Sequence, residues 1–266
     1  MTLFSELLGT LTPDGATFNA VASDDWRQGR TLYGGASAAL CLEACLRLVA
    51  DQAATLAPLR SAQISFIGPA ASDLRLQPVI VRQGRSTTFM GCDLLSEGQI
   101  ATRAVFCFGA ARSSPVTRLG ARAPDVPGPE ACTAFFPQAR RPAFAQHFDV
   151  RLAAGARPLS GAAEPDLTIW ARHGDPNAPD NAVSLLALAD VPPPAAFTAL
   201  SQPAMISTMT WMVDILDATA LSAPGWKLMR STAETIAEGY SAQAMTIWAE
   251  DGAAILAGRQ TIAVFA

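Results

Sequence analysis

Histidine is scarce in this chain. His147 and His173 are the two histidines among 266 residues, too few and too far apart for a histidine-based metal site or a typical acid–base pair. The cysteines are odd in number and lack CxxC spacing, which disfavours a disulfide framework; they are Cys41, Cys45, Cys92, Cys107 and Cys132. Any catalysis must therefore rest on carboxylate, hydroxyl and amide groups, and we expect neither a metal ion nor another cofactor.

Positive charge is sparse as well. The 19 lysines and arginines are scattered along the chain, the net charge is −4, and the isoelectric point lies near 5.2. Nucleic-acid-binding proteins concentrate basic residues on one surface, and this sequence shows no such concentration. Nucleic acid is therefore excluded as an expected partner.

No apolar run is long enough to cross a membrane. Glu43, Arg47 and Asp51 interrupt the richest apolar segment before it reaches the roughly 18 residues that a span requires. Residues 1–15 lack a basic start and include acidic side chains, unlike a secretory signal. We therefore expect a cytoplasmic protein without a membrane span.

What the chain does contain is a repeated order of elements. The pattern predicts a helix over 34–57 that is apolar on nearly every side, and then strands over 60–67, 73–83, 86–96 and 100–110. Proline-rich residues 111–142 have the composition of a linker. Beyond them we expect strands over 144–152 and 165–172, a helix over 180–199, and strands over 204–216, 226–237, 240–250 and 254–265.

The two parts resemble one unit used twice. Two long hairpins of matching length support this, opened by Gln83-Gly84-Arg85-Ser86 and by Glu238-Gly239-Tyr240-Ser241. Two tandem repeats of a helix with an antiparallel sheet make an α+β fold. The predicted division is an N-terminal unit at 1–110, a linker at 111–142 and a C-terminal unit at 143–266.

Positions that are polar in one copy and apolar in the other cannot be explained by shared packing. When the copies are superposed, with a register uncertain by one or two residues, Asp190 falls over Ala44, Thr208 over Ala62 and Gln260 over Phe106. A carboxylate in the apolar helix context before residue 190 is costly to bury unless it is hydrogen-bonded or has a function. These three residues are the candidates for a site.

Each candidate also has a structural explanation. Asp190 can end a helix, because Pro192-Pro193-Pro194 follow it, and its carboxylate can then be solvated or cap a second helix. Threonine is common in strands, so Thr208 can be a packing residue, and Gln260 can be an exposed strand residue. The residues alone leave these alternatives open.

Four short segments, in their order and spacing, resemble the TesB-type (type II) acyl-CoA thioesterase family over nearly the whole chain. They are Leu32-Tyr33-Gly34-Gly35, Gln83-Gly84-Arg85-Ser86, Ala187-Leu188-Ala189-Asp190 and Gly258-Arg259-Gln260. The resemblance implies a double-hotdog fold and a site formed by an aspartate, a hydroxyl residue and a glutamine. These roles fall on Asp190, Thr208 and Gln260.

The resemblance further implies hydrolysis of acyl-CoA thioesters by a water molecule that these three side chains position. Gly34 and Gly35 open the first predicted helix, where unpaired amides can receive an oxyanion, although glycines there also suit a tight turn or close packing. Acyl-CoA is the expected substrate, and the hydrophobic sheets are compatible with self-association into a homo-oligomer.

Two rival functions remain open from the sequence. A double-hotdog protein can bind acyl-CoA or a lipid without turnover, and the proline run after Asp190 favours this alternative. A hotdog hydratase or dehydratase uses a histidine with an acid, and no Asp-x-Asn-x-x-His pattern occurs here. Hydrolysis is the preferred prediction.

Overall fold

The computed structural model of the protein describes residues 1–51, 56–120, 122–137, 141–219 and 225–265. The first half contains α1 (Phe4–Gly9), β1 (Thr12–Asp14), β2 (Thr17–Val21), η1 (Asp24–Trp26), β3 (Arg27–Gln28), β4 (Thr31–Leu32), α2 (Gly34–Ala50), β5 (Leu59–Phe66), β6 (Asp73–Gln83), β7 (Thr87–Ser96) and β8 (Gln99–Gly109). The second half contains η2 (Pro129–Ala131), β9 (Thr133–Ala134), η4 (Ala143–His147), β10 (Phe148–Gly155), β11 (Asp166–His173), α3 (Ala182–Ala189), α4 (Ala196–Ala199), β12 (Met205–Ile215), β13 (Lys227–Ala237), β14 (Tyr240–Ala249) and β15 (Ala254–Phe265).

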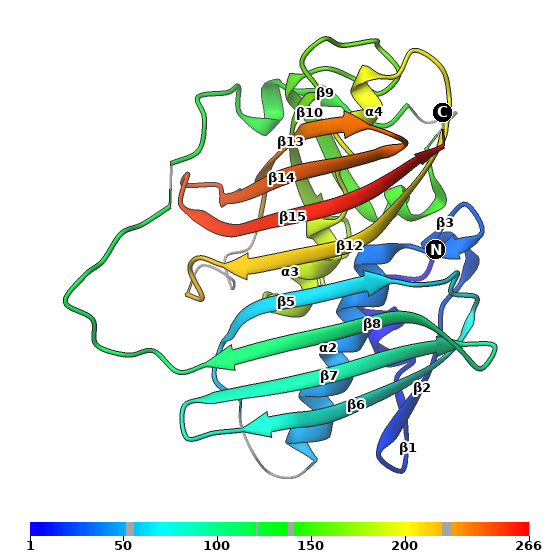
Figure 1. Ribbon diagram of the computed structural model, residues 1–266, viewed down its shortest axis with the longest axis vertical. Coiled ribbons are helices and arrows are strands. Elements are labelled where there is room, and N and C mark those ends of the chain that lie inside the picture. Colours follow the sequence, from blue (N-terminus) through cyan, green and yellow to red (C-terminus); the bar gives the residue numbers. More distant parts are fainter. Residues whose placement is uncertain (52–55, 121, 138–140, 220–224, 266) are drawn as a thin grey trace.

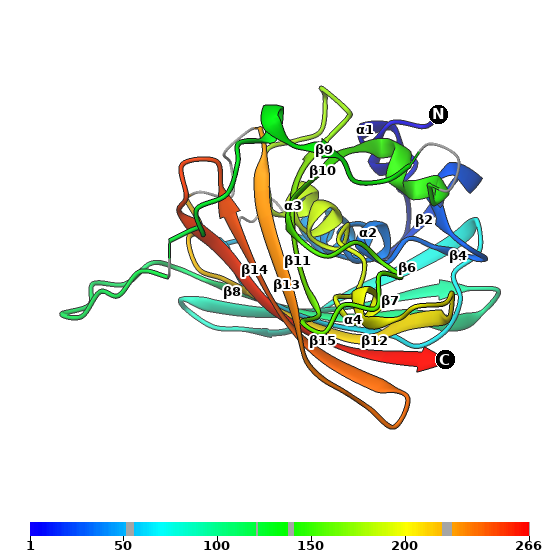
Figure 2. The ribbon, with the colours of Figure 1, turned by 90° about the horizontal axis from the view of Figure 1, so that it is seen from above.

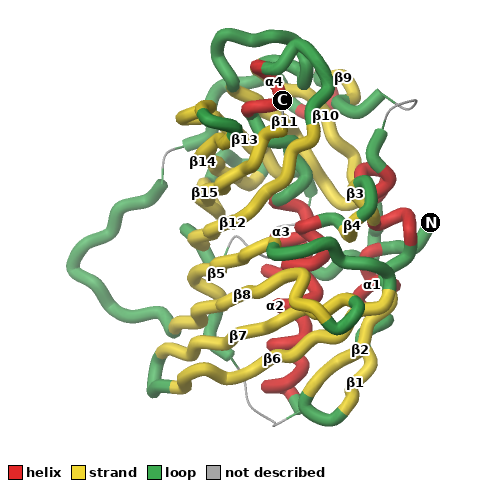
Figure 3. Tube along the Cα trace, turned by 45° about the vertical axis from the view of Figure 1, so that its right-hand side comes forward, coloured by secondary structure: helices red, strands yellow, loops and turns green. Residues whose placement is uncertain are grey.

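One antiparallel sheet runs through both halves. Thirteen of the described strands form it, in the order β1-β2-β6-β7-β8-β5-β12-β15-β14-β13-β11-β10-β9. The halves join where β5 pairs with β12, with Ser65 opposite Thr210 and Ser61 opposite Asp214 (Figure 1). The sheet curves around α2 and α3 (Figure 2), and both helices lie on one side of its strands (Figure 3). This arrangement confirms the predicted α+β double hotdog.

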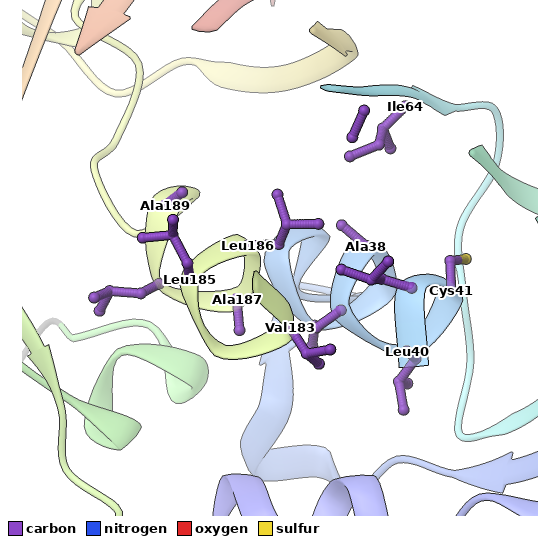
Figure 4. Packing of buried hydrophobic residues seen from close by; sticks show 14 of the residues in the cluster. Ala38, Leu40, Cys41, Ile64, Val183, Leu185, Leu186, Ala187 and Ala189 are labelled. Atoms are coloured by element: carbon purple, nitrogen blue, oxygen red, sulfur yellow. The ribbon is translucent and has the colours of Figure 1, made fainter. Parts of the chain in front are cut away.

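Helix α2 is enclosed, as its sequence predicted. Its alanines at 36, 38, 39 and 44 are fully buried, because α3 and strands of the sheet pack against it on several sides. Figure 4 shows Leu186 of α3 and Ala38 of α2 on the side of the helices that faces Ile64 of β5. Small side chains on α2 let the second helix approach closely. None of the described helices has the length and apolar character needed to span a membrane.

Both predicted helices were too long. Helix α2 ends at Ala50 with Asp51 as its C-cap, and part of the predicted remainder, 52–55, lies outside the described residues. The single helix over 180–199 is wrong: α3 stops at Ala189 and the short α4 follows. Three prolines in succession lack the amides that a continuing helix needs, which explains the break.

The start of the predicted strand 144–152 is wrong. Residues 143–147 form the 3-10 helix η4, and the strand β10 begins only at Phe148. The short elements α1 and β1 to β4 were not predicted. The β1–β2 hairpin extends the sheet beside β6, with Phe18 opposite Leu76. In the proline-rich segment, Pro127 accepts a hydrogen bond from Trp170, and β9 pairs with β10. The unit boundaries at 110 and 142 stay a prediction.

Two histidines, His147 buried and His173 half-buried, pack between the N-terminal segment and the second half. His147 stacks on Trp26 with ring centroids 3.9 Å apart, and its Nε2 lies 3.0 Å from the carbonyl oxygen of Asp25. His173 packs against Phe4 and Phe148, and its Nε2 lies 2.9 Å from the carbonyl oxygen of Ser184. Burial lowers the pKa of both rings, even though nearby oxygens oppose that shift. Both rings are therefore neutral at neutral pH.

Neutral histidines that are packed in this way make stability sensitive to acid. A lowered folded-state pKa favours the unfolded chain as pH falls below the ordinary histidine value of about 6.5, at up to about 1.4 kcal/mol per pH unit for each ring. His147→Gln is expected to cost stability at about pH 8, and this deficit relative to the wild type is expected to narrow as pH falls toward about 5. Urea unfolding of both proteins at several pH values measures it; a constant deficit contradicts the account.

Candidate active site

Asp190 occupies the C-cap of α3. The N-cap of the helix is Asn181, whose side chain accepts hydrogen bonds from the amides of Val183 and Ser184, and the helix ends at Ala189, shortly before the proline run. The carboxylate is partly buried, and its Oδ1 accepts a hydrogen bond of 2.9 Å from Nε2 of Gln260. The residue therefore ends a helix and faces inward at the same time. It does not cap α4, whose N-cap is Ala195.

The start of α2 lies directly against Asp190. A Cβ atom added to Gly34 would meet Oδ2 of Asp190 at 2.6 Å, and the backbone amide of Gly35 donates a hydrogen bond to the same carboxyl group. A Cβ on Gly35 would meet the carbonyl oxygen of Ala187 at 2.5 Å. Tyr33, the N-cap of α2, donates a hydrogen bond of 2.7 Å to that carbonyl. Both glycines are thus required for the close approach of α2 to α3.

Gln260 lies on β15 with its side chain in the interior. The residue is 5% exposed, and its Oε1 accepts a hydrogen bond of 2.6 Å from Nε2 of Gln243 on β14. Gln243 is 1% exposed, and its Oε1 accepts a hydrogen bond of 2.8 Å from the amide of Ala195. The structural alternative of an exposed strand glutamine at 260 is wrong. Gln243 is a site neighbour that the sequence reasoning missed.

Thr208 lies near this pair without bonding to it. In β12 it pairs with Ile262 of β15, and after a bulge at 208–210 Trp211 pairs with Gln260. Directly opposed residues share a face of a sheet, so Thr208 shares the inner face with Ile262 and Gln260 and is a diagonal neighbour of Gln260. No hydrogen bond within the described residues joins Thr208 to Asp190 or Gln260.

The structure corrects the register of the copy comparison at Thr208. Phe106 pairs with Ala62, whereas Gln260 pairs with Trp211, so Ala62 corresponds to Trp211 and not to Thr208. Both strands carry a one-residue bulge at the equivalent place, 59–61 in β5 and 208–210 in β12, so Thr208 corresponds to Leu59. The connection from helix to strand is longer in the second half, where α4 lies between α3 and β12, so a register set on the helices does not carry over to these strands.

Electrostatics at the site centre on Asp190. Burial raises the pKa of its carboxyl group to about 7, against the opposing effect of hydrogen bonds from Gln260 and the Gly35 amide. Tyr33 is the ionisable neighbour, and burial, with the Asp190 charge as a smaller cause, raises the pKa of its phenol well above the ordinary value. Asp190 is therefore poised to gain or lose a proton near neutral pH, while Tyr33 stays neutral.

Comparison with family models assigns the chain. The model described as the acyl-CoA thioesterase N-terminal domain matches residues 22–109, and the model of the acyl-CoA thioesterase C-terminal domain matches residues 124–264. The chain belongs to the acyl-CoA thioesterase family. This acyl-CoA thioesterase is an enzyme, and thioester hydrolysis is its type of reaction. The TesB-like resemblance seen in the sequence is confirmed.

Solved structures share the fold over the whole length. A conserved hotdog-fold protein of unknown function from Alicyclobacillus acidocaldarius has a TM-score of 0.88 at 25% identity, covering 99% of this chain and 98% of its own. The acyl-CoA thioesterase II TesB2 of Mycobacterium marinum has a TM-score of 0.75 at 16% identity, covering 98% and 97%. The tesB protein of Mycobacterium avium has a TM-score of 0.77 at 17% identity, covering 98% and 99%. No curated protein matches the chain.

The cysteines of the thioesterase do not contribute to the candidate site around Asp190. Cys41 and Cys45 of α2 are buried near Cys92 of β7, and all five cysteines are free. The hydrogen bond with Cys92, together with burial, raises the pKa of Cys41 and Cys45, so neither is a reactive thiolate. Among the described residues, no group of three or more histidine, cysteine, aspartate or glutamate side chains is arranged to hold a metal ion.

Proposed function

We propose that the protein hydrolyses acyl-CoA thioesters with Asp190 as the general base, assisted by Thr208 and Gln260. The observation that supports this most strongly is the contact between the halves: a carboxyl group with a pKa of about 7 lies against the start of α2 and bonds to Gln260. A base with a pKa near the working pH combines the correct protonation state with sufficient basicity.

In the proposed step, Asp190 accepts a proton from a water molecule whose oxygen attacks the thioester carbonyl carbon. Thr208 and Gln260 would hold this oxygen from the inner face of the sheet that they share. The carbonyl oxygen becomes an oxyanion, and its collapse breaks the carbon–sulfur bond. The proton on Asp190 then passes to the departing thiolate, which leaves free acid, free CoA thiol and the ionised base.

The oxyanion would be received at the start of α2. Gly34 and Gly35 occupy its first two positions, where amides have no partner within the helix, and the N-terminal end of the helix dipole favours negative charge. The Gly35 amide already donates to Asp190. The Gly34 amide is therefore the main proposed donor to the oxyanion, and the Gly35 amide holds the base beside it.

A panel of acyl-CoAs of different chain length tests the proposal by the release of free thiol. We expect thiol release from at least one member, and the preferred member identifies the substrate. Saturable binding without thiol release supports a binding protein instead. Loss of enoyl absorbance without thiol release supports a hydratase. Either result would overturn the proposed hydrolysis.

The pH dependence follows from the raised pKa of Asp190. Only the ionised carboxylate can accept the water proton, so kcat is expected to fall about tenfold per pH unit below the pKa of about 7 and to level off above it. Initial rates at saturating substrate, from about pH 5 to about pH 8.5, measure this. A kcat that stays constant over that range, or falls as pH rises, contradicts the assignment of the base.

A further inference from the structure

Three hydrogen bonds behind Asp190 run in one direction. The Ala195 amide donates to Oε1 of Gln243, Nε2 of Gln243 donates to Oε1 of Gln260, and Nε2 of Gln260 donates to Oδ1 of Asp190. The distances are 2.8, 2.6 and 2.9 Å. We call these four groups the amide chain. It begins at a backbone amide and ends at the proposed base.

The backbone amide sets the direction of the whole chain. An N–H group can only donate, so Gln243 must turn its carbonyl oxygen to Ala195 and its NH2 group to Gln260. Gln260 must then turn its own carbonyl oxygen to Gln243, which leaves its NH2 group for Asp190. If the Gln260 amide were flipped, an oxygen would face the carboxylate, and that repulsion would disfavour the ionised base.

The position of Ala195, where the amide chain begins, is fixed by the structure around it. Ala195 is fully buried, and the first turn of α4 fixes it, since Thr198 bonds to its carbonyl through both its amide and its hydroxyl group. The proline run after Asp190 connects α3 to Ala195. Pro192-Pro193-Pro194, which favoured a protein without turnover in the sequence analysis, thus directly precede the donor that begins the amide chain.

The first half has no such chain at the corresponding place. Strands β7 and β14 are of equal length, and Met90 and Gln243 are the fourth residue of each. Met90 pairs with Phe106, as Gln243 pairs with Gln260. A methionine and a phenylalanine, both fully buried, thus replace the two glutamines. The fold itself needs only apolar packing there, which points to a function for the glutamine pair in the second half.

We propose that Gln243 is a positioning residue of the thioesterase, which fixes the amide of Gln260 so that an N–H group, and not a carbonyl oxygen, faces Asp190. This inference rests on the proposed function of Asp190. Gln243 acts through Gln260 and does not touch the substrate. Without it, Gln260 can rotate, and the ionised base loses a dependable donor.

Gln243→Met tests this with the residue that the first half uses. We expect kcat to fall about tenfold with KM changed less than about twofold, and the acid limb of the pH profile to move to higher pH. In a Gln260→Met background, Gln243→Met is expected to have no further effect on kcat, because the two residues act as a unit. Independent, multiplying effects of the two substitutions, or a folded Gln243→Met enzyme with wild-type kcat and pH profile, overturn the inference.

Ser241→Ala is the matched control. Ser241 is 1% exposed on the same strand, two residues from Gln243, and its hydroxyl group has no hydrogen-bond partner among the described residues. This variant should keep wild-type kcat and pH profile. If it loses activity as Gln243→Met does, disturbed packing of β14 explains both results and the positioning function is rejected.

Gln243→Glu keeps the side-chain shape and serves if the methionine variant does not fold. A protonated glutamic acid can still donate to Gln260, but an ionised one cannot. Burial raises the pKa of the new glutamic acid, so this side chain ionises only at alkaline pH and then stops donating to Gln260. The kcat is therefore expected to fall at alkaline pH, where that of the wild type levels off. Tyr33 does not contribute to this fall, because its phenol stays neutral. A wild-type plateau in this variant overturns the inference.

The pKa of the Asp190 carboxyl group can be measured without substrate from the NMR chemical shift of its carboxyl carbon. This measurement separates the inference from the proposed function. A higher pKa in Gln243→Met supports the positioning function even if no acyl-CoA is hydrolysed. An unchanged pKa in a protein that does hydrolyse acyl-CoA overturns the positioning function alone.

Discussion

Replacing Asp190 by asparagine is expected to lower kcat for acyl-CoA hydrolysis by about a thousand-fold, within the range known for loss of a general base. Asparagine keeps the shape of the side chain and can still accept the Gln260 hydrogen bond, but it cannot take a proton from water. KM is expected to change little, because the substitution removes an interaction of the transition state. Thiol release at saturating substrate, at about pH 8, measures the loss.

The matched control is Asp214→Asn, which removes an exposed carboxylate from β12. It should retain wild-type kcat. An Asp190→Asn enzyme with more than about a tenth of wild-type kcat contradicts the general-base assignment.

The same variant is expected to unfold at a higher urea concentration than the wild type. The folded-state pKa of Asp190 is raised from 3.8 to about 7, so its ionised form destabilises the folded protein. Asparagine removes that cost but loses the hydrogen bond from the Gly35 amide, so we expect a net gain of about 1–2 kcal/mol at about pH 8. The gain should disappear as pH falls from about 7 to about 4. A less stable variant at alkaline pH contradicts this.

Replacing Gly35 by alanine is expected to destabilise the protein by about 3 kcal/mol and to abolish most activity. The added methyl group would lie 2.5 Å from the carbonyl oxygen of Ala187 and 2.7 Å from the ring of Tyr33. The first of these is backbone, so α2 and α3 must separate, and the hydrogen bond from Tyr33 to Ala187 stretches or breaks. Asp190 then loses its place against α2. Urea unfolding and thiol release measure the two effects.

Gly9→Ala is the control for this substitution. Gly9 ends α1, and an added Cβ would have no atom of the described residues within 4 Å beyond its chain neighbours and its own helix backbone. Its stability should equal or slightly exceed that of the wild type, because alanine restricts the unfolded chain. If the free energies of unfolding of Gly35→Ala and Gly9→Ala differ by less than about 0.5 kcal/mol, the contact between α2 and α3 is looser than the structure shows.

Much of the fold could be read from local patterns. Strand β6 alternates between exposed and buried residues over its first part, and both β6 and β15 are bounded by turn residues, so their predicted limits agree closely with the structure. The enclosed helix α2 was evident from its apolar residues on every side. The short elements before α2 were missed because two to six residues carry too little periodicity.

The site divides in the same way. Asp190 and Gln260 could be found because each interrupts an apolar pattern that the other copy keeps. Gln243 carried the same signal, since an apolar residue stands at its place in the first copy. The proposed positioning function of Gln243 could not be predicted from the sequence, because this function depends on where Ala195 lies after the proline run. Self-association stays a prediction.

Hydrolysis in oxygen-18 water under single-turnover conditions tests the central claim most directly. With enzyme in excess over acyl-CoA, direct attack by a water molecule on the thioester puts one labelled oxygen into the released acid, together with one equivalent of thiol. This is the result that we expect, with both products lost in Asp190→Asn. Absence of thiol release, or a first-turnover acid without label and a labelled Asp190 carboxyl group, would show that Asp190 does not activate water here.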